Sequence, residues 1–373
     1  MLKIRISLIL LHGISVTAFS YDKVIVGVLA SFAPPHKLGE NFSPGEAELW
    51  DNIELHVRYG SRLAAEKYCP SDIAVTDYDT KGTVEGTVAA IKRAESEGAK
   101  ALVGFVTSGL VLTVNKLYPH RTIPAFTTTA TNDEVPGKLP PTLQMAYNNT
   151  TEGKALVKAI AKIPKKYLER MYLLTDVTNP FSVQLSQEIK KHYKSLVPEL
   201  TYSSPLKWAP SHWPLEGLNK ATSLIMTGEG EEVLEVVTHL SPLNHDYMVI
   251  GGDAWYRGNI TGYIRNQDLY VPDTLAMGHW SPRFQDHASR SFVKTYKQRF
   301  NATPGGTAAI AYDAVKVICE TWKRKKSLEF KNFVGPVFDG LTGKIHFTSE
   351  GAQDMKRPSL YWFHDGEYHD QRL

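Results

Sequence analysis

Val103-Gly104-Phe105-Val106-Thr107-Ser108-Gly109 is an apolar strand pattern that ends in small hydroxyl residues, and a second stretch of this kind follows at Ala125–Asn132. In an open parallel sheet, ligands bind beyond the carboxyl ends of the strands. Hydroxyl groups, free backbone N–H groups and a helix N-terminus together suit a small anion such as a carboxylate. Neither stretch contains a catalytic base, so the sequence predicts a site that holds a ligand without changing it.

Around these stretches, strand patterns alternate with helix patterns. The elements expected in the first half are 24–29, 49–67, 73–75, 84–97, 101–103, 110–117 and 125–127. After the loop Asn132–Pro141, a second series is expected at 153–163, 170–175, 181–193, 222–226, 231–240 and 247–251. This order is typical of parallel sheets with helices on both faces, so we expect an α/β fold of two lobes with a cleft between them. Asp365-Gly366 predicts the turn of a hairpin near the C-terminus.

Length and composition indicate a two-domain globular protein. A chain of 373 residues is too long for one ordinary core, and 42% hydrophobic with 22% charged residues is ordinary for a soluble fold. Without Lys3 and Arg5, 40 of the 42 basic residues remain against 39 acidic ones. Because basic residues are not in excess, the sequence shows no basic surface for nucleic acid, and nucleic acid is not expected as a partner.

The N-terminus resembles a secretory signal peptide. Lys3 and Arg5 precede an apolar run from Ile6 to Val16, and Ala18-Phe19-Ser20 offers small residues for cleavage before Tyr21. No later segment reaches the length of about 20 apolar residues that spans a bilayer. We therefore expect residues 1–20 to be removed and the product to be exported to the periplasm.

Cys69 and Cys319 are the two cysteines of the chain. Export permits a disulfide, but two cysteines so far apart in the sequence do not predict one. Each lies in or beside an apolar helix pattern, so two buried thiols explain the sequence at least as well. The pairing is therefore open, and a metal site made by these two residues alone is not expected.

Five stretches, in order and spacing, resemble the branched-chain amino acid (Leu/Ile/Val) receptors among the type I periplasmic solute-binding proteins that serve ABC transporters. The stretches are Val24–Val28, Val103–Ser108, Ile123–Asn132, Ala311–Val315 and Phe338–Phe347. The resemblance implies two doubly wound parallel-sheet lobes joined by a three-segment hinge, with ligand bound in the cleft and closure by hinge motion. It implies a first lobe of 21–144 and 277–333, and a second of 145–276 and 334–373.

The resemblance also implies the residues of the site. In the first lobe, Ser108 and the Gly109 N–H would hold the ligand carboxylate. The second binding loop would be formed by Thr129, Ala130 and Thr131, whose hydroxyl and backbone groups contact both charged ends of an amino acid. The alternatives are that Ser108 caps the following helix and that the loop hydroxyls satisfy one another.

In the second lobe, the resemblance places Asp253 where an acidic residue meets the ligand ammonium, and Phe181 where a cleft aromatic stands. The alternatives are a helix N-cap for Asp253 and a core position for Phe181. Weaker candidates for apolar walls are Tyr147, Trp255 and Tyr256.

Two departures from the family pattern leave the ligand open. The loop Ser31–Gly45 is longer and richer in proline than usual, and Thr227–Gly230 replaces a loop that often carries a cleft tyrosine. An amino acid is the best interpretation, while an amide or another small carboxylate stays possible. Leucine itself does not follow.

Signals for catalysis and metal binding are weak. His364, Glu367 and His369 fall on one face of the expected hairpin, but a solvated hairpin explains them better than a metal site. No nucleophile elbow, phosphate loop or zinc-protease motif occurs, and no cofactor is expected. Histidines in loop-like sequence, without a nucleophile pattern nearby, are His36, His120, His212 and His279.

The sequence therefore favours a non-enzymatic transport receptor that captures a small molecule and docks, as a monomer, on a membrane permease. A sensory module of the same fold that signals through a partner protein is the alternative. A hydrolase of the same two-lobed shape is a third, and the lack of a nucleophile–base pattern argues against it.

Overall fold

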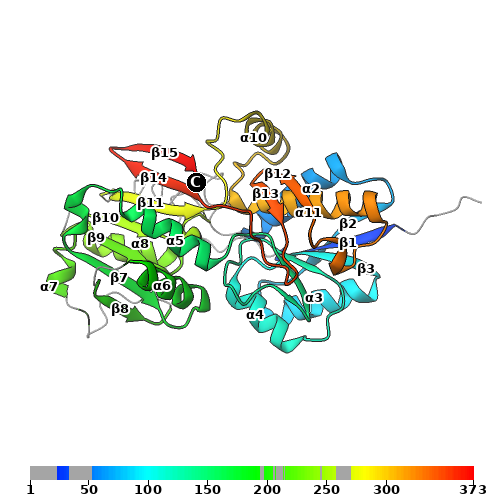
Figure 1. Cartoon of the computed structure of the whole chain (residues 1–373), viewed down its shortest axis with the longest axis horizontal. Helices are drawn as coiled ribbons and strands as arrows, with labels where there is room; N and C mark the ends of the chain where they lie inside the picture. Colours follow the sequence, from blue (N-terminus) through cyan, green and yellow to red (C-terminus); the bar gives the residue numbers. More distant parts are fainter. Residues whose placement is uncertain are drawn as a thin grey trace, which may run out of the picture.

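The computed structural model describes residues 23–32, 53–193, 197–204, 206, 213, 215–243, 246–257 and 270–373. Two α/β lobes lie side by side along the long axis of the molecule (Figure 1). The expectations for the signal segment 1–20 and for most of the loop Ser31–Gly45 fall outside the described residues. The expected α/β class with two parallel-dominated sheets is confirmed.

The first lobe is built on a six-stranded sheet of order β2-β1-β3-β4-β6-β5, parallel except for β5. Its strands are β1 Val24–Ala30, β2 Ile73–Asp79, β3 Ala99–Gly104, β4 Ala125–Thr127, β5 Gly137–Lys138 and β6 Pro141–Gln144. Its helices are α2 Ile53–Tyr68, α3 Val84–Ser96, α4 Ser108–Leu117, α10 His287–Phe300 and α11 Gly306–Lys325, with a 3-10 turn η3 Phe330–Asn332.

Alternate residues of the central strands enter two cores, one on each face of this sheet. Val103 packs with α2, α10 and α11, whereas its neighbour Leu102 packs with α3 and α4. Because successive strand side chains point to opposite faces, a strand covered on both sides must be apolar throughout. This burial explains why β1 and residues 101–103 of β3 are continuous hydrophobic runs in the sequence.

The second lobe is built on a seven-stranded sheet of order β15-β14-β11-β10-β9-β7-β8. Its strands are β7 Met171–Asp176, β8 Glu199–Tyr202, β9 Ser223–Met226, β10 Met248–Gly251, β11 Asp273–Gly278, β14 Ser359–His364 and β15 Glu367–Arg372. Its helices are α5 Asn149–Ile160, α6 Pro180–His192, α7 Leu215–Leu218 and α8 Gly230–Leu240, with 3-10 turns η1 Lys165–Leu168 and η2 Asp253–Arg257. The expected Asp365-Gly366 turn joins β14 to β15, with positive φ at both residues.

The chain passes between the two sheets three times. It leaves the first after β6, returns after β11, and crosses again between the hairpin of β12 (Val337–Gly340) and β13 (Gly343–His346) and strand β14. This hairpin packs Phe338 and Ile345 into the core of the first lobe. The contacts therefore place the third crossing at 348–358, later than the boundary at 334 that we expected.

A disulfide joins Cys69, just after α2, to Cys319 in α11, with their Cα atoms 4.9 Å apart. The alternative of two buried thiols is therefore wrong. The sequence left the pairing open because only the packing of α2 against α11 brings the two positions together.

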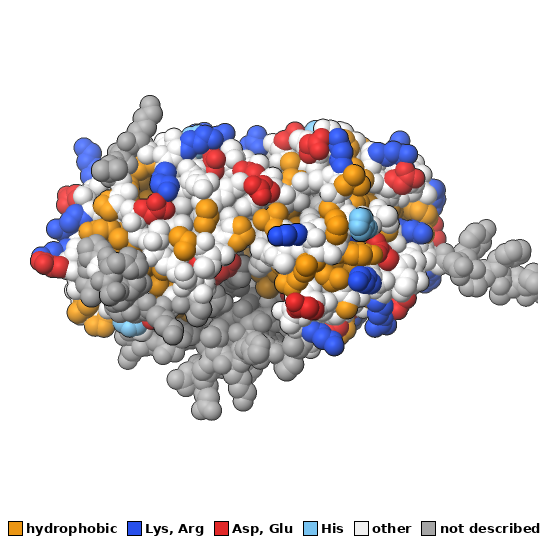
Figure 2. All heavy atoms as spheres, turned by 90° about the horizontal axis from the view of Figure 1, so that it is seen from below, with side chains coloured by type: hydrophobic (Ala, Val, Ile, Leu, Met, Phe, Trp, Pro, Cys, Tyr) orange, Lys and Arg blue, Asp and Glu red, His pale blue; other side chains and the backbone are white. Residues whose placement is uncertain are grey.

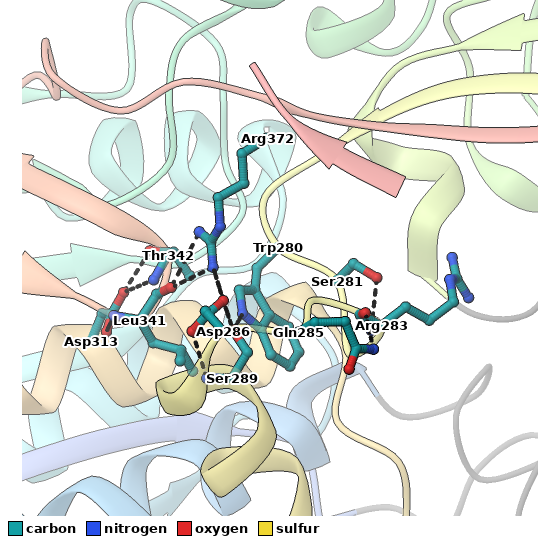
Figure 3. A network of polar contacts seen from close by, with 10 residues as sticks. All are labelled: Trp280, Ser281, Arg283, Gln285, Asp286, Ser289, Asp313, Leu341, Thr342 and Arg372. Carbon is teal, nitrogen blue, oxygen red and sulfur yellow. Dashed lines mark hydrogen bonds and ion pairs between the residues drawn. The ribbon is translucent and has the colours of Figure 1, made fainter. Parts of the chain in front are cut away.

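A polar clasp ties the last strand of the second lobe to the first lobe (Figure 3). Arg372, at the end of β15, donates from Nη2 to Asp286 Oδ2 at 3.0 Å and to Ser289 Oγ at 3.3 Å. Asp286 is also the N-cap of α10, accepting from the Ser289 N–H at 2.9 Å. The clasp thus holds the start of α10 near the segment after β11, where the chain crosses between the lobes for the second time.

The described surface has the mixed charge that the composition predicts. On the face in Figure 2, basic and acidic side chains are interspersed over both lobes. Within the described part of the chain, no helix combines the length and apolarity needed to cross a bilayer.

Candidate ligand-binding site

A small cavity lies between the lobes, at the carboxyl ends of the parallel strands. Its lining residues are Val106, Thr107, Ser108, Thr129, Thr131, Phe181, Glu229, Asp253 and Ala254. Five of the seven residues predicted for the site, from four separate stretches of sequence, meet here. Gly109 and Ala130 are the two that do not line it.

The first-lobe wall is the N-terminus of α4. Gly104 (φ +151°) and Phe105 (φ +61°) make the sharp turn from β3, and a Cβ on Gly104 would lie 2.7 Å from the Leu29 carbonyl oxygen. Glycine is therefore required at the turn that aims the helix at the cleft. Thr107 is the N-cap, because its Oγ1 accepts from the Leu110 N–H at 3.3 Å.

Because Thr107 caps the helix, Ser108 does not have to. Its Oγ accepts from the Asn132 N–H at 3.1 Å and keeps its own proton for donation. Among the described residues, the N–H groups of Ser108 and Gly109 have no protein acceptor, as expected for the first turn of a helix. The Ser108 hydroxyl thus lines the cavity at the positive end of the helix dipole, in a turn whose first two N–H groups have no protein acceptor.

The hydroxyl groups of the second stretch, Ala125–Asn132, differ in their partners. Thr129 Oγ1 donates to the Val106 carbonyl at 2.6 Å, so this hydroxyl serves the loop, as the structural alternative predicted. Thr131 Oγ1 is buried and has no partner among the described residues. Ala130 packs into the core between the sheet and α3 and α4. Thr127 and Thr128 also have buried hydroxyls without a described partner, but Thr131 is the one of the three that lines the cavity.

The second-lobe wall comes from α6 and η2. Pro180 opens α6 and Asn179 caps it, which places Phe181 at the cavity while its side chain packs in the core. Asp253 begins η2, directly after β10 and the pair Gly251-Gly252. Its Oδ2 lies 2.8 Å from His279 Nε2, and no N–H group of the described residues bonds its Oδ1, so it does not act as an N-cap.

A second buried acid stands behind Asp253. Glu152, in the first turn of α5, accepts the Asp253 N–H on Oε1 at 2.6 Å and is fully buried. Burial raises the pKa of the Glu152 carboxyl well above its ordinary value, and the nearby charge of Asp253 raises it further. Burial and the neighbouring Asp253 carboxylate therefore favour the neutral form of Glu152.

Several residues of this region carry no signal of their own in the sequence. An adjoining cavity shares Thr129 and Asp253 and is otherwise lined by Ile53, Gly278, His279, Gly306 and Thr307. His279 was set aside because its neighbours in the sequence show no motif. Glu229 lies in the loop that departs from the family pattern, and this departure was the signal that could have identified it.

The lobes touch across the cleft. Asn132 Nδ2 donates to the Pro180 carbonyl at 3.0 Å, and the Asp133 N–H donates to Gln184 Oε1 at 2.8 Å. In both bonds, a first-lobe residue after β4 meets the first turns of α6. These two bonds hold the walls of the small cavity close together.

A roomier cavity of about 480 Å³ lies elsewhere, between α2, α10, α11 and the turn after β12. It contains none of the predicted site residues, and its Lys67 and Lys316 are balanced by Glu66 and Asp339. We assign the site to the smaller cleft because hydroxyl groups, a helix N-terminus and a carboxylate converge only there among these two cavities.

Comparison with known proteins agrees with this geometry. A sequence model of the family described as "periplasmic binding protein" matches residues 58–358. No curated protein sequence matches the chain significantly. Among solved structures, the leucine binding protein LivK of Thermotoga maritima superposes with a TM-score of 0.76 at 18% identity, covering 93% of this chain and 97% of that one.

Two further structures differ in their bound ligands. LivJ of Streptococcus pneumoniae, in complex with isoleucine, has a TM-score of 0.74 at 16% identity over 94% of this chain and 99% of that one. A solute-binding protein of R. palustris, in complex with benzoate, has a TM-score of 0.71 at 15% identity over 94% and 97%. At these identities the likeness shows the fold, and the ligand must be argued from the site itself.

Proposed function

Because the chain belongs to the periplasmic binding protein family, as the sequence resemblance predicted, we propose that it is the substrate-binding protein of an ABC importer and that its cargo is an amino acid. The protein would be exported to the periplasm and would act as a monomer. It would capture the ligand between its lobes, close, and deliver the ligand to a membrane permease.

One observation carries the choice of ligand: the two walls of the cavity are complementary to the two ends of an amino acid. The first lobe offers the Ser108 hydroxyl and two N–H groups of α4, which suit a carboxylate. The second lobe offers Asp253 Oδ1, which suits an ammonium group. A ligand that engages both walls joins the lobes, and its binding energy favours closure.

The charges of the lining argue against a simple carboxylic acid. Asp253 and Glu229 both line the cavity, whereas no Lys or Arg is among its described lining residues. A ligand without an amino group would place its carboxylate near these acids and leave Asp253 without a cation. The amino group is therefore the feature that should separate this cargo from a benzoate-like one.

The site supports binding without turnover. Ser108 and the Asp253–His279 pair border the same cleft, yet among the described hydrogen bonds Ser108 Oγ accepts from Asn132 and has no bond to His279. A nucleophile needs such a base within hydrogen-bond reach.

Micromolar affinity, about −8 kcal/mol, is attainable from two or three charge-assisted bonds and one buried apolar group.

A thermal-shift screen tests this proposal. The probes are the common L-amino acids, their amides, and the matching acids that lack the amino group. An amino acid present at about 100 times its Kd stabilises the folded protein by about 2.7 kcal/mol and should raise the melting temperature measurably. A rise with the amine-free acids alone would contradict an amino acid cargo.

A further inference from the structure

Asp253 is supported from behind by three buried polar side chains, Glu152, His279 and Tyr147, which we name the support cluster. They come from three places: Glu152 from α5, His279 from the second crossing after β11, and Tyr147 from the first crossing after β6. Their side chains are buried, with exposures of 0%, 4% and 1%. Two of the three segments that connect the lobes therefore meet at the ligand-binding acid.

The cluster fixes both the backbone and the side chain of Asp253. Glu152 Oε1 accepts the Asp253 N–H at 2.6 Å, which holds the start of η2. His279 Nε2 lies 2.8 Å from Asp253 Oδ2, which sets the orientation of the carboxylate. The imidazole is itself held by the Tyr147 ring, with ring centroids 4.6 Å apart.

The two carboxylate oxygens of Asp253 have different surroundings. Oδ2 is paired with His279, whereas Oδ1 is buried and receives no N–H group of the described residues, and the Glu152 carboxyl lies within hydrogen-bonding reach of the Asp253 side chain. A buried carboxylate oxygen without a partner is costly, and a ligand cation relieves that cost. Since Asp253 lines the cavity, the pairing with His279 leaves one oxygen for a ligand.

We propose that His279 and Glu152 are positioning residues that turn Asp253 Oδ1 toward the ligand ammonium and so set the preference for an amino group. This inference rests on the proposed function, in which Asp253 meets that group. His279 acts through Asp253 and lies on a crossing between the lobes, so the bond that orients the carboxylate also anchors it to the hinge.

The experiment compares His279→Ala with His279→Gln, whose amide N–H can replace the imidazole donor. The probe pair is the L-amino acid that stabilises the wild-type protein most and the same molecule without its amino group. Calorimetry then gives the ratio of the two affinities. His279→Ala should reduce this ratio about tenfold, since a reoriented carboxylate loses the ammonium bond but not the carboxylate grip. His279→Gln should restore it to within about threefold.

A matched control is His346→Ala, which removes another histidine–aspartate pair, His346 Nδ1 to Asp354 Oδ1 at 2.7 Å, away from the cavity lining. It should leave the ratio unchanged. Glu152→Gln keeps the Oε1 acceptor and should also keep the ratio, whereas Glu152→Ala should lower it.

The outcomes separate the inference from the proposed function. If His279→Ala folds and weakens both probes equally, or leaves the ratio unchanged, the positioning role is wrong while the amino acid cargo stands. If Asp253→Asn also leaves the ratio unchanged, the ammonium binds elsewhere and the inference is wrong at its base. If the wild-type protein binds no amino acid, the proposed function fails, and the inference fails with it.

Discussion

At the scale of single residues, we propose that ligand choice depends on the Asp253 side chain. Asp253→Asn keeps its size but removes its negative charge, so the ligand ammonium loses a charge-assisted bond. We expect the affinity for an amino acid to fall at least tenfold, about 1.4 kcal/mol, in calorimetry. Asp354→Asn, a change at an aspartate outside the cavity lining, is the control and should have no effect. An unchanged affinity for Asp253→Asn would remove this residue from the site.

Glu152 should affect stability in a pH-dependent way. Its folded-state pKa lies above the ordinary 4.5 because the carboxyl is buried beside Asp253. Below pH 4.5 the folded and unfolded chains both carry this proton, and above it the unfolded chain loses the proton first. The wild-type free energy of unfolding therefore falls with rising pH, by up to about 1.4 kcal/mol per unit from this group.

Glu152→Gln does not titrate and should escape this loss. Urea unfolding at about pH 5 and about pH 8 should show the variant gaining on the wild type as pH rises. Glu85→Gln changes an exposed glutamate in the first turn of α3 and serves as the control. A stability difference for Glu152→Gln that is the same at both pH values would contradict a neutral Glu152.

At the scale of elements, the N-terminus of α4 separates two neighbouring hydroxyls by function. Both residues line the cavity, but the Thr107 hydroxyl caps the helix, whereas the Ser108 hydroxyl does not. Thr107→Ala should lower the free energy of unfolding by about 1 kcal/mol, the usual worth of an N-cap. Ser108→Ala should instead weaken amino acid binding with a smaller effect on stability. Chemical unfolding measures the stability of both variants, and calorimetry measures their ligand affinity. If Thr107→Ala weakens binding and Ser108→Ala lowers stability, the two roles must be exchanged.

The sequence predicts elements better than it predicts contacts between them. β1 and β3 were evident because strands covered on both faces are continuous apolar runs. The β12–β13 hairpin was assigned to the wrong side of the third crossing, because the alternation of Phe338 and Ile345 shows a buried face without showing which core buries it.

The same limit applies to the site. Five predicted residues met at one cavity because each follows a strand or opens a helix at the same edge of its sheet. His279 was missed because its importance comes from a contact with Asp253, 26 residues away. The roles of Thr107 and Ser108 could not be separated either, since adjacent hydroxyls at a helix start are equivalent in sequence and differ only in direction.

At the scale of the whole molecule, the Cys69–Cys319 disulfide should be a main source of stability. It joins α2 to α11 inside the first lobe, across a sequence separation of 250 residues. Removing it with Cys69→Ala and Cys319→Ala together should lower the free energy of unfolding by about 2–5 kcal/mol. The cleft is lined by other residues, so ligand affinity at room temperature should be preserved. Loss of binding without loss of stability would contradict this assignment.

The same disulfide has a consequence for survival among proteases. The disulfide closes a loop of the chain from Cys69 to Cys319, and the second-lobe strands β7 to β11 all lie within this loop. A single peptide-bond cut anywhere in that loop leaves the two fragments attached to each other. The nicked protein should migrate as one band without reductant and as two with it, whereas a cut beyond Cys319 should release a free C-terminal piece. A periplasmic binding protein built in this way can be cut in its second lobe while both parts of its first lobe stay covalently joined.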